Sequence, residues 1–322
     1  MLADCLEPRP LGSSGMTVSA LSLGSWRTYE RLPVESGIQV MRAARDQGIT
    51  FFDDARYNDE TGRAPIPSGQ SEVVFGTIFR AAGLARDEVI IANKLWWEFW
   101  PQQNAVAELN ESLARMGLDY IDLIYAGPPA AGMSVAELVA EVGALIKAGT
   151  ARAWGVLNWP AELLSEAGTV AAAAGVQAPC AAQLPYSIVR RSPVEDEAMT
   201  KAVAQVGGAV VASFCLEGGI LSGKYFGGPR PGRAADVLDQ PRFAPAVAAV
   251  PALSAFASRV AATPAAAALA FTLARESVAS VLFGATSAEQ VVANCSATGL
   301  LQRLSAGELA ELRLIGAGAP AG

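Results

Sequence analysis

The chain has 322 residues, of which 52% are hydrophobic and 17% charged, and its formal net charge at pH 7 is −7. This composition predicts a globular protein with a large core, and the length suits either two average domains or one large α/β barrel. The negative charge argues against a nucleic-acid-binding protein, which needs a basic surface, and disfavours binding to an anionic membrane.

Histidine is absent from the chain, and the four cysteines are widely spaced without a CxxC pair. A disulfide framework, a zinc site and catalysis by a transition metal are therefore not expected. The N-terminus lacks the basic and apolar regions of a signal peptide. Prolines and Arg259 interrupt the Ala-rich stretch 244–274, so this stretch is not expected to span a bilayer. We therefore expect a cytoplasmic protein.

Short apolar runs alternate along the chain with segments of helical periodicity. Continuous apolar runs of this length are typical of strands that are buried on both faces, as in parallel sheets. In chain order the expected strands are a weaker run at 19–25, then 49–53, 88–94, 120–126, 151–158, 180–186, 208–214 and 280–285.

Apolar residues at spacings of three and four predict helices between most of these strands. The pattern is clear at Val106, Leu109 and Leu113, which lie on one helix face, and similar faces begin at Val34 and Val135. Further helices are expected near 70–82, 161–173, 193–206, 264–275 and 287–297. Segment 225–245 is rich in Gly, Pro and Arg and is expected to be a long loop, a kind of segment that is often functional.

About eight strands, most of them followed by a helix, predict a parallel sheet with right-handed crossovers. Eight such units closed on themselves form a (β/α)8 TIM barrel, and a doubly wound open sheet is the alternative within the α/β class. Because no low-complexity linker divides the chain, we expect one domain over residues 1–322.

Three polar residues stand where a parallel barrel carries its active site, at the C-terminal ends of strands. Asp53 and Lys94 end two of the expected strands, and Tyr57 follows Asp53 by four residues. An ammonium near a phenol lowers the pKa of the phenol, which can then donate a proton to a substrate oxygen, while a carboxylate neutralises the ammonium. The alternative is a structural ion pair between Asp53 and Lys94, with Tyr57 an ordinary loop residue.

A glycine-rich segment matches part of a phosphate-binding loop. Residues Gly218 to Lys224 fit GxxxxGK, but Tyr225 stands where a Ser or Thr should bind magnesium. An NTPase is therefore not expected, although glycine amides and a lysine can cradle a diphosphate. The chain has no GxGxxG sequence, so a Rossmann dinucleotide site is not supported.

Two further segments are open to two interpretations each. Segment 284–294 places Gly, Thr and Ser before an expected helix, which suits either phosphate binding or an ordinary N-cap by Thr286 or Ser287. Four aromatic residues crowd positions 96–100, where they either wall a substrate pocket or pack on neighbouring loops.

Eight segments, in order, resemble the signatures of the aldo-keto reductases: LGSSGMTVSALSLGSW, GITFFDDARY, VIIANK, YIDLIYA, WGVLNW, AAQLPYS, ILSGKY and SVLFGATSAEQVVAN. They extend from about residue 10 to residue 300, and they look most like the branch that includes voltage-gated potassium-channel β-subunits and their bacterial relatives. The resemblance implies a (β/α)8 barrel whose bottom is closed by an N-terminal β-hairpin, here residues 9–22. It also implies NADPH bound in extended form and hydride transfer to a carbonyl.

The catalytic set of that family is Asp, Tyr, Lys and His. Asp53 and Lys94 match their motifs, whereas Tyr57 comes one residue early for the usual DTAxxY spacing. In the DLxxxH pattern, the position of the His is filled by Gly127. Because the family tolerates substitution at this position, the resemblance implies an enzyme that is differently equipped, with Tyr57 as the remaining proton donor.

The resemblance also implies cofactor-binding residues in addition to Asp53. From the nicotinamide to the adenosine end they are Ser25, Trp26, Asn158, Gln183, Leu216, Gly218, Lys224, Arg233, Gly284, Thr286, Gln290 and Asn294. Asn158 and Gln183 would bind the carboxamide, and Lys224 with Arg233 would favour the 2′-phosphate of NADPH. Two departures imply weaker or altered binding: Ser213 replaces an aromatic residue that stacks on the nicotinamide, and Ala293 replaces a Glu at the adenine.

Three functional hypotheses remain. The first is an NADPH-dependent reductase of a carbonyl, or of an activated C=C or imine, in a small molecule whose apolar or cyclic character suits the aromatic turn. The second is an NADPH-binding regulatory protein with little turnover, and the third is a non-redox cyclase or dehydratase on the same barrel. Neither nucleic acid nor a membrane is an expected partner, and a homo-oligomer is compatible with the sequence.

Overall fold

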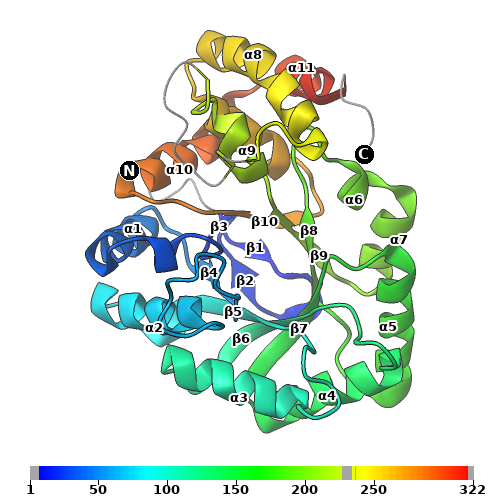
Figure 1. The fold of residues 1–322 in the computed structure, drawn as a ribbon. Helices are drawn as coiled ribbons and strands as arrows, with labels where there is room; N and C mark the ends of the chain where they lie inside the picture. The colour runs from blue at the N-terminus through cyan, green and yellow to red at the C-terminus, as the bar shows by residue number, and fades with distance from the viewer. Residues whose placement is uncertain (1–6, 227–233, 236, 318–322) are drawn as a thin grey trace.

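The computed structural model describes residues 7–226, 234, 235 and 237–317, and its centre is a closed barrel of eight parallel strands (Figure 1). Each strand pairs with the next strand in the chain, and the last pairs with the first. The strands are β3 (Leu21–Gly24), β4 (Phe51–Asp53), β5 (Ile90–Leu95), β6 (Ile121–Ala126), β7 (Ala151–Leu157), β8 (Ala181–Pro185), β9 (Ala209–Ser213) and β10 (Val278–Phe283). The (β/α)8 prediction is confirmed, and each of the eight predicted runs overlaps one of these strands, although β5 ends one residue later than predicted and β10 begins two residues earlier.

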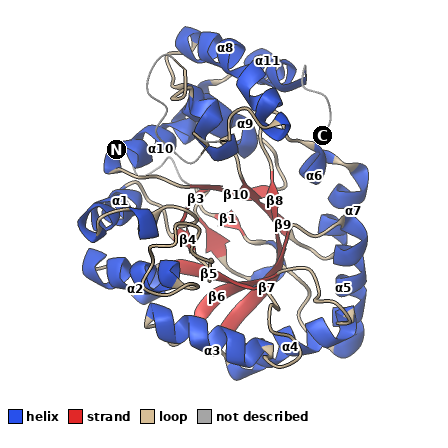
Figure 2. Cartoon of the chain, viewed as in Figure 1, coloured by secondary structure: helices blue, strands red, loops and turns tan. Residues whose placement is uncertain are grey.

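Figure 2 shows the helices as a ring around the strands. They are α1 (Val34–Asp46), α2 (Gln70–Ala82), α3 (Ala105–Met116), α4 (Val135–Ala148), α5 (Ala161–Ala174), α6 (Ser192–Glu195), α7 (Glu197–Gln205), α8 (Ala244–Arg259), α9 (Pro264–Leu273), α10 (Ala288–Arg303) and α11 (Ala306–Ala317). The single helix predicted at 193–206 is wrong, because the extended ψ of 139° at Asp196 separates α6 from α7. Helices α8 and α11 were not predicted.

Local sequence signals set the limits of the helices on the β5–β7 side. Asn104 caps α3 by accepting a hydrogen bond from Ala107 N at 2.9 Å, and Ser134 with Glu137 forms a capping box on α4. Helix α3 ends at Gly117, whose φ of 67° is a conformation that glycine adopts without steric cost. These limits return the chain to the barrel directly, so that β5, β6 and β7 run side by side.

The predicted hairpin is present but shorter than expected. It pairs β1 (Arg9–Pro10) with β2 (Thr17–Val18), because the chain beyond residue 20 belongs to β3 of the barrel. A Cβ on Gly12 would lie 2.2 Å from the carbonyl oxygen of Cys180, which directly precedes β8. The hairpin therefore closes the N-terminal end of the barrel and leaves the C-terminal end open.

Two buried layers stabilise the fold. The larger layer lies between the strands and the helices, and a smaller cluster inside the barrel includes Leu11, Phe51, Leu123, Tyr125 and many alanines. Burial of apolar side chains contributes roughly 25 cal/mol per Å² removed from water. The cluster inside the barrel therefore lies beneath the polar residues at the strand ends and packs against them.

The Ala-rich stretch at 244–274 forms α8 and α9. Pro251 lies inside α8 without ending it, and the chain breaks instead at 260–263. Among the residues that the structure describes, no single helix is long and apolar enough to cross a membrane. Segments Pro241–Arg259 and Pro264–Leu273, bent by 92°, pass that test only as a pair, and every residue of α9 after Pro264 is buried in the fold.

Candidate active site

Strained backbone is concentrated at the open, C-terminal end of the barrel. Arg27, Trp97, Asn158, Phe214 and Glu217 have φ between 47° and 59°, and all five closely follow strands of the barrel. A residue other than glycine in this region costs on the order of 1 kcal/mol or more, and such residues cluster at functional sites. The strain therefore marks this end of the barrel as the candidate active site.

Three of the predicted residues meet at this end of the barrel. Asp53 ends β4 and Lys94 lies on β5, both nearly inaccessible to solvent, and the Lys94 ammonium forms an ion pair with Asp53 Oδ1. Lys94 Nζ also donates to the hydroxyl of Tyr57 at 3.2 Å and to the carbonyl oxygen of Asp54 at 3.4 Å. The early position of Tyr57 in its motif therefore does not keep its hydroxyl away from Lys94.

Gln183 completes this arrangement from the opposite side of the barrel. Its Nε2 donates to Asp53 Oδ2 at 2.9 Å, so the two carboxylate oxygens of Asp53 have different partners. The backbone N–H of Asn158 donates to the carbonyl oxygen of Gln183 at 3.0 Å. Gln183 thus holds the carboxylate, whereas the resemblance implies contact with the cofactor carboxamide.

Two tyrosines lie near Asp53, and only one can serve as an acid for a ligand. Tyr125 is fully buried inside the barrel, where burial and then the charge of Asp53 raise its pKa well above the usual value. Tyr57 is only partly buried and lines a cleft at the surface. A substrate at the open end of the barrel can therefore reach Tyr57 but not Tyr125.

A second carboxylate, Asp54, directly follows Asp53 of the Lys94–Asp53 pair. Asp54 is fully buried, accepts a hydrogen bond from Ser25 Oγ, and has no hydrogen-bond partner for Oδ2 among the described residues. Burial, and next the charge of Glu72, raises the pKa of Asp54 well above its usual value. Ser25 therefore holds Asp54 in this structure, and the doubled acid of "FFDD" was the only sequence signal for this group.

Gly127 lies at the end of β6, in the place assigned to the family histidine. Its N–H donates to Leu95 O at 2.9 Å, and its carbonyl oxygen accepts from Trp97 Nε1 at 3.1 Å. A Cβ built at Gly127 would lie 3.0 Å from Leu95 O and 3.9 Å from Trp96 Cα, with no other atom within 4 Å. Space for a longer side chain therefore exists, at the cost of one tight contact with the backbone.

The aromatic turn after β5 combines both interpretations of the sequence. The Trp96 ring lies 6.3 Å from the ring of Tyr57, whereas Trp97 is buried and packs edge-on against Trp100 at 6.5 Å. Glu108 fixes the turn by accepting hydrogen bonds from the N–H groups of Trp96 and Trp97 at 2.8 and 3.3 Å. Trp96 therefore borders the site, and Trp97 supports it from the core.

An aromatic pair lies across the strand ends on the other side of the site. Trp26, after β3, and Phe214, after β9, have ring centroids 5.7 Å apart. Ser213 was expected to leave this side without an aromatic residue, but the left-handed φ of 58° at Phe214 places the next side chain against Trp26. The contact of Phe214 with Trp26 could not be predicted from sequence position, because a residue in the left-handed conformation points its side chain in a different direction from an extended residue.

The glycine-rich segment after β9 is a compact turn. Gly218 and Gly219 have φ of 68° and 93°, and a Cβ on Gly219 would lie 3.0 Å from Lys224 Cε. Leu216 is half-buried in front of this turn. Glu217 anchors the turn through hydrogen bonds from Ser187 Oγ at 2.7 Å and from Arg190 Nη2 at 2.9 Å. Arg233 lies outside the described residues.

The segment after β10 leads into the N-terminus of α10. Ser287 is the N-cap, which confirms that interpretation of the sequence, and the exposed Thr286 is bonded to Gln290. Gln290 Oε1 accepts from the N–H and the hydroxyl of Thr286 at 3.0 and 3.2 Å. Gly284 is half-buried before this turn, and Asn294 is buried on the first half of α10.

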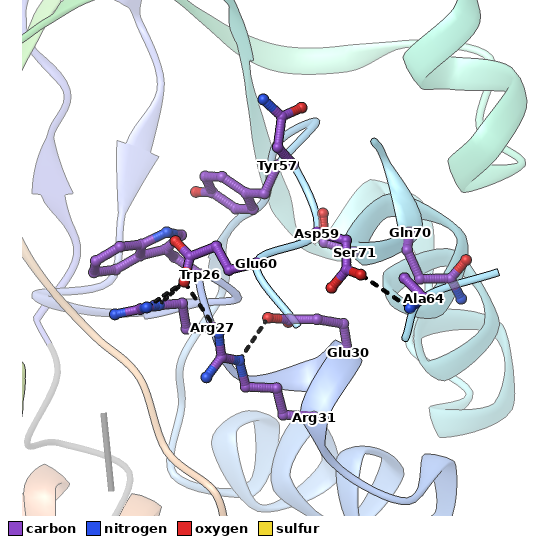
Figure 3. Close-up of a pocket in the computed structure, with 11 residues that line it drawn as sticks. Trp26, Arg27, Glu30, Arg31, Tyr57, Asp59, Glu60, Ala64, Gln70 and Ser71 are labelled. Carbon is purple, nitrogen blue, oxygen red and sulfur yellow. Dashed lines mark hydrogen bonds and ion pairs between the residues drawn. The ribbon is translucent and has the colours of Figure 1, made fainter. Parts of the chain in front are cut away.

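A narrow cleft opens beside Tyr57 (Figure 3). Its walls come from the segment after β3 and from the insertion between β4 and α2. The lining residues are Trp26, Arg27, Glu30, Arg31, Tyr57, Asn58, Asp59, Glu60, Ala64, Gln70 and Ser71. The Tyr57 side chain therefore lies between the Lys94–Asp53 pair and this cleft.

Comparison with known proteins agrees with this geometry. A sequence model described as the aldo/keto reductase family matches residues 20–316. The chain belongs to this family. Similar proteins include a probable voltage-gated potassium channel subunit beta from Oryza sativa subsp. japonica, 31% identical over 234 residues, and one from Arabidopsis thaliana, 29% identical over 234 residues. Both matches cover 70% of this chain and 69% of the relative.

Family membership supports an oxidoreductase that depends on a nicotinamide nucleotide. The described residues fit such a group. In the turn at Gly218 and Gly219, a Cβ on Gly219 would contact Lys224. Because glycine has none, the backbone of the turn and the Lys224 side chain lie close together, as a site for a diphosphate requires. Thr286 and Gln290 are exposed at the start of a helix, where an anion is favoured.

Proposed function

We propose that this protein reduces the carbonyl of a small molecule, with NADPH as the reductant and Tyr57 as the proton donor. The observation that carries the proposal is the contact of Lys94 Nζ with the Tyr57 hydroxyl at 3.2 Å, made while Asp53 neutralises Lys94. A purely structural ion pair between Asp53 and Lys94 would not require the contact that Lys94 also makes with the partly accessible Tyr57.

Each residue then has a distinct part in the reaction. NADPH, when bound, supplies a hydride to the carbonyl carbon. Tyr57 gives its proton to the carbonyl oxygen, and the Lys94 ammonium stabilises the phenolate that remains. Asp53, fixed by Gln183 at 2.9 Å, keeps Lys94 in place and balances its charge. The product is an alcohol, and solvent returns the proton to Tyr57.

Without the family histidine, only one donor is assigned to the carbonyl oxygen. Loss of a positioned donor costs roughly a hundredfold or more in rate. Gly127 therefore predicts slow reduction of simple aldehydes and leaves space that a bulkier substrate can fill.

We assign the cofactor to the strand ends from β7 to β10 together with β3. Trp26 and Phe214 would border the nicotinamide, Asn158 and the side-chain amide of Gln183 would meet its carboxamide, and the 216–224 turn would hold the diphosphate. Gly284, Thr286, Gln290 and Asn294 would meet the adenosine end. Lys224, with Arg233, would favour NADPH over NADH through its additional phosphate.

A regulatory protein that binds NADPH and turns over little is the second candidate. Two observations favour it: the similar plant proteins are named as channel subunits, and Gly127 removes a catalytic donor. In this case the nucleotide would bind as proposed, but the rate of NADPH consumption would stay near background with every carbonyl compound.

The deciding experiment measures NADPH binding and NADPH consumption on the same preparations. Tyr57→Phe should abolish reduction of an aldehyde panel while leaving the NADPH Kd, measured by fluorescence titration, within a few-fold. Tyr120→Phe is the matched control, because Tyr120 stacks on Arg86 at the opposite end of the barrel. Full activity in Tyr57→Phe would refute the assignment of the acid, and tight binding without turnover in the wild type would favour the regulatory candidate.

A further inference from the structure

The cleft beside Tyr57 carries two arginines that the reduction of a simple carbonyl does not require. Arg27 and Arg31 come from the segment after β3, with side chains 30% and 34% exposed. Arg27 is held in the left-handed region at φ 53°, and its guanidinium lies 5.3 Å from the centroid of the Trp26 ring. Arg27 therefore combines a strained backbone with a cation that stacks on the wall of the cleft.

One carboxylate of the protein itself joins these two arginines. Glu60, in the insertion between β4 and α2, pairs with Arg27 and accepts from Arg31 Nη2 at 3.2 Å through the same oxygen. Figure 3 shows the Glu60 carboxylate next to Trp26, with interactions drawn to both arginines. The space that remains in the cleft is about 20 Å³, which is room for little more than a water molecule.

Glu60 is the carboxylate that Arg27 and Arg31 share, so the donors of both guanidinium groups would become available to another anion if Glu60 moved away. Arg31 Nε also pairs with Glu30 at 3.3 Å, which offsets one of the two guanidinium charges. Asp59 adds a negative charge beside the cleft, but its carboxylate accepts hydrogen bonds from Thr61 and Ala64 within its own turn and makes no ion pair with either arginine. Without Glu60, Arg27 would therefore have no carboxylate partner among the described residues, and Arg31 would keep only Glu30.

We propose that this cleft, the arginine cleft, is a subsite for a carboxylate on the carbonyl substrate, and that Glu60 occupies it when substrate is absent. The proposal rests on the proposed function, since Tyr57 is the proton donor at the same cleft. Guanidinium groups bind carboxylates through directed, charge-assisted hydrogen bonds. The Trp26 and Tyr57 rings suit a flat body between the two ends, so the substrate class is an aromatic or alicyclic aldehyde or ketone with a carboxylate.

The competing explanation is a surface ion pair without a ligand, of a kind that contributes little to stability. The two explanations differ in what they predict for ligands. A structural pair is indifferent to the charge of the substrate, whereas a subsite discriminates strongly between a carboxylate and a neutral group of the same shape.

The first measurement compares kcat/KM for 4-carboxybenzaldehyde and 4-formylbenzamide, which differ in charge but not in shape. The wild type should prefer the carboxylate by about tenfold or more, because two guanidinium groups face it. Arg27→Gln and Arg31→Gln should each reduce this ratio, and the double variant should bring it close to 1. Glu60→Gln should raise the ratio by about threefold, because the internal competitor is removed.

The matched controls come from an exposed ion pair of the same type far from the cleft. Arg259 on α8 pairs with Glu311 on α11, with side chains 53% and 43% exposed. Arg259→Gln and Glu311→Gln should leave the ratio unchanged. A change in these variants as large as that in the cleft variants would show a general effect of net charge and would overturn the proposal.

A binding measurement separates failure of the subsite from failure of the proposed function. Isothermal titration calorimetry should show that terephthalate binds the wild type more tightly than terephthalamide does, with and without NADP⁺, and that the double arginine variant loses the difference. This result without any turnover would retain the subsite and refute the reductase. Equal ratios in the kinetic test, or loss of terephthalate binding when NADP⁺ is saturating, would overturn the subsite.

Discussion

The two halves of the open barrel end are built differently. After the roles proposed for them, we call the side formed by Asp53, Tyr57, Lys94 and Gln183 the catalytic side and the side formed by residues 216–224 and 284–294 the cofactor side. On the catalytic side, contacts join residues far apart in sequence, and three of the four side chains are buried. On the cofactor side, Thr286 and Gln290 are exposed and bonded to each other across four residues. Lys224, also exposed, lies against its neighbour Tyr225.

This difference indicates which half is preorganised. A buried ion pair with directed hydrogen bonds keeps its geometry without a ligand, as a site of electrostatic catalysis requires. Exposed polar groups that bond to local neighbours can exchange those partners for phosphate or adenosine at small cost. We therefore expect changes on the catalytic side to affect stability and rate together, and changes on the cofactor side to affect nucleotide affinity alone.

The largest expected effect is that of Lys94→Met. This change leaves the Asp53 carboxylate buried with Gln183 as its remaining side-chain partner, and an uncompensated buried charge destabilises by about 3–5 kcal/mol. The rate of reduction should fall to background, since Tyr57 loses its contact with the ammonium. Urea unfolding and NADPH consumption measure the two effects.

Lys224→Met is the matched control on the cofactor side. It removes an exposed lysine, so its free energy of unfolding should stay within about 0.5 kcal/mol of the wild type while the NADPH Kd rises. Equal losses of stability in the two variants would contradict the division of the barrel end into two kinds of site.

Much of the catalytic side could be predicted because strand ends converge in a parallel barrel. The apolar runs that end at Asp53 and Lys94 predicted two neighbouring parallel strands, and their common end predicted that the two side chains lie close together. The position of the Tyr57 hydroxyl could not be derived in this way, because it depends on the path of an irregular loop. In the structure that loop brings the hydroxyl within 3.2 Å of Lys94.

Gly127→His should sharpen the comparison by adding a second donor to the catalytic side. We expect kcat/KM for simple aldehydes to rise about tenfold, less than an ideally placed donor provides, because the new Cβ lies 3.0 Å from Leu95 O. Gly127→Ala is the control, since it adds the tight contact without the imidazole. A gain in both variants would attribute the effect to backbone shift, and no gain in either would show that Gly127 is not the vacated donor position.

Asp54→Asn should stabilise the protein, because Asp54 is a fully buried acid whose Oδ2 has no hydrogen-bond partner among the described residues. The folded pKa of Asp54 is raised by burial and by Glu72, above an unfolded value of about 3.9. The contribution of such an acid to stability is complete below the unfolded pKa and is lost as the pH rises toward the folded pKa. The variant should therefore gain on the order of 1 kcal/mol near neutral pH, from removing an incompletely satisfied buried acid.

The pH dependence is the decisive part of that measurement. The stability difference between Asp54→Asn and wild type, from urea unfolding, should shrink as the pH falls from 7 to about 4. Asp87→Asn, at an exposed acid before β5, is the control for removal of one negative charge. A difference that is constant with pH would mean that Asp54 has the same protonation behaviour in the folded and unfolded chain.

Other features of the site lay beyond prediction for definite physical reasons. The helix-capping Ser287 could be read from local sequence, but the pairing of Trp26 with Phe214 depends on a left-handed residue after β9. The bond from Ser25 to Asp54 and that from Gln183 to Asp53 join residues 29 and 130 positions apart. Contacts of this range depend on how the barrel closes, and periodicity carries no information about them.

The smallest expected effect is that of Gln290→Ala, which tests the cofactor side alone. The change removes the acceptor that holds the N–H and hydroxyl of Thr286 at 3.0 and 3.2 Å. The free energy of unfolding should change by less than about 0.5 kcal/mol, because the residue is exposed, while the NADPH Kd should rise about threefold. Gln205→Ala, at the exposed end of α7 on the opposite end of the barrel, should alter neither quantity. If Gln290→Ala destabilised the chain without changing the Kd, the Thr286–Gln290 contact would be a structural cap, and the adenosine would have to bind elsewhere.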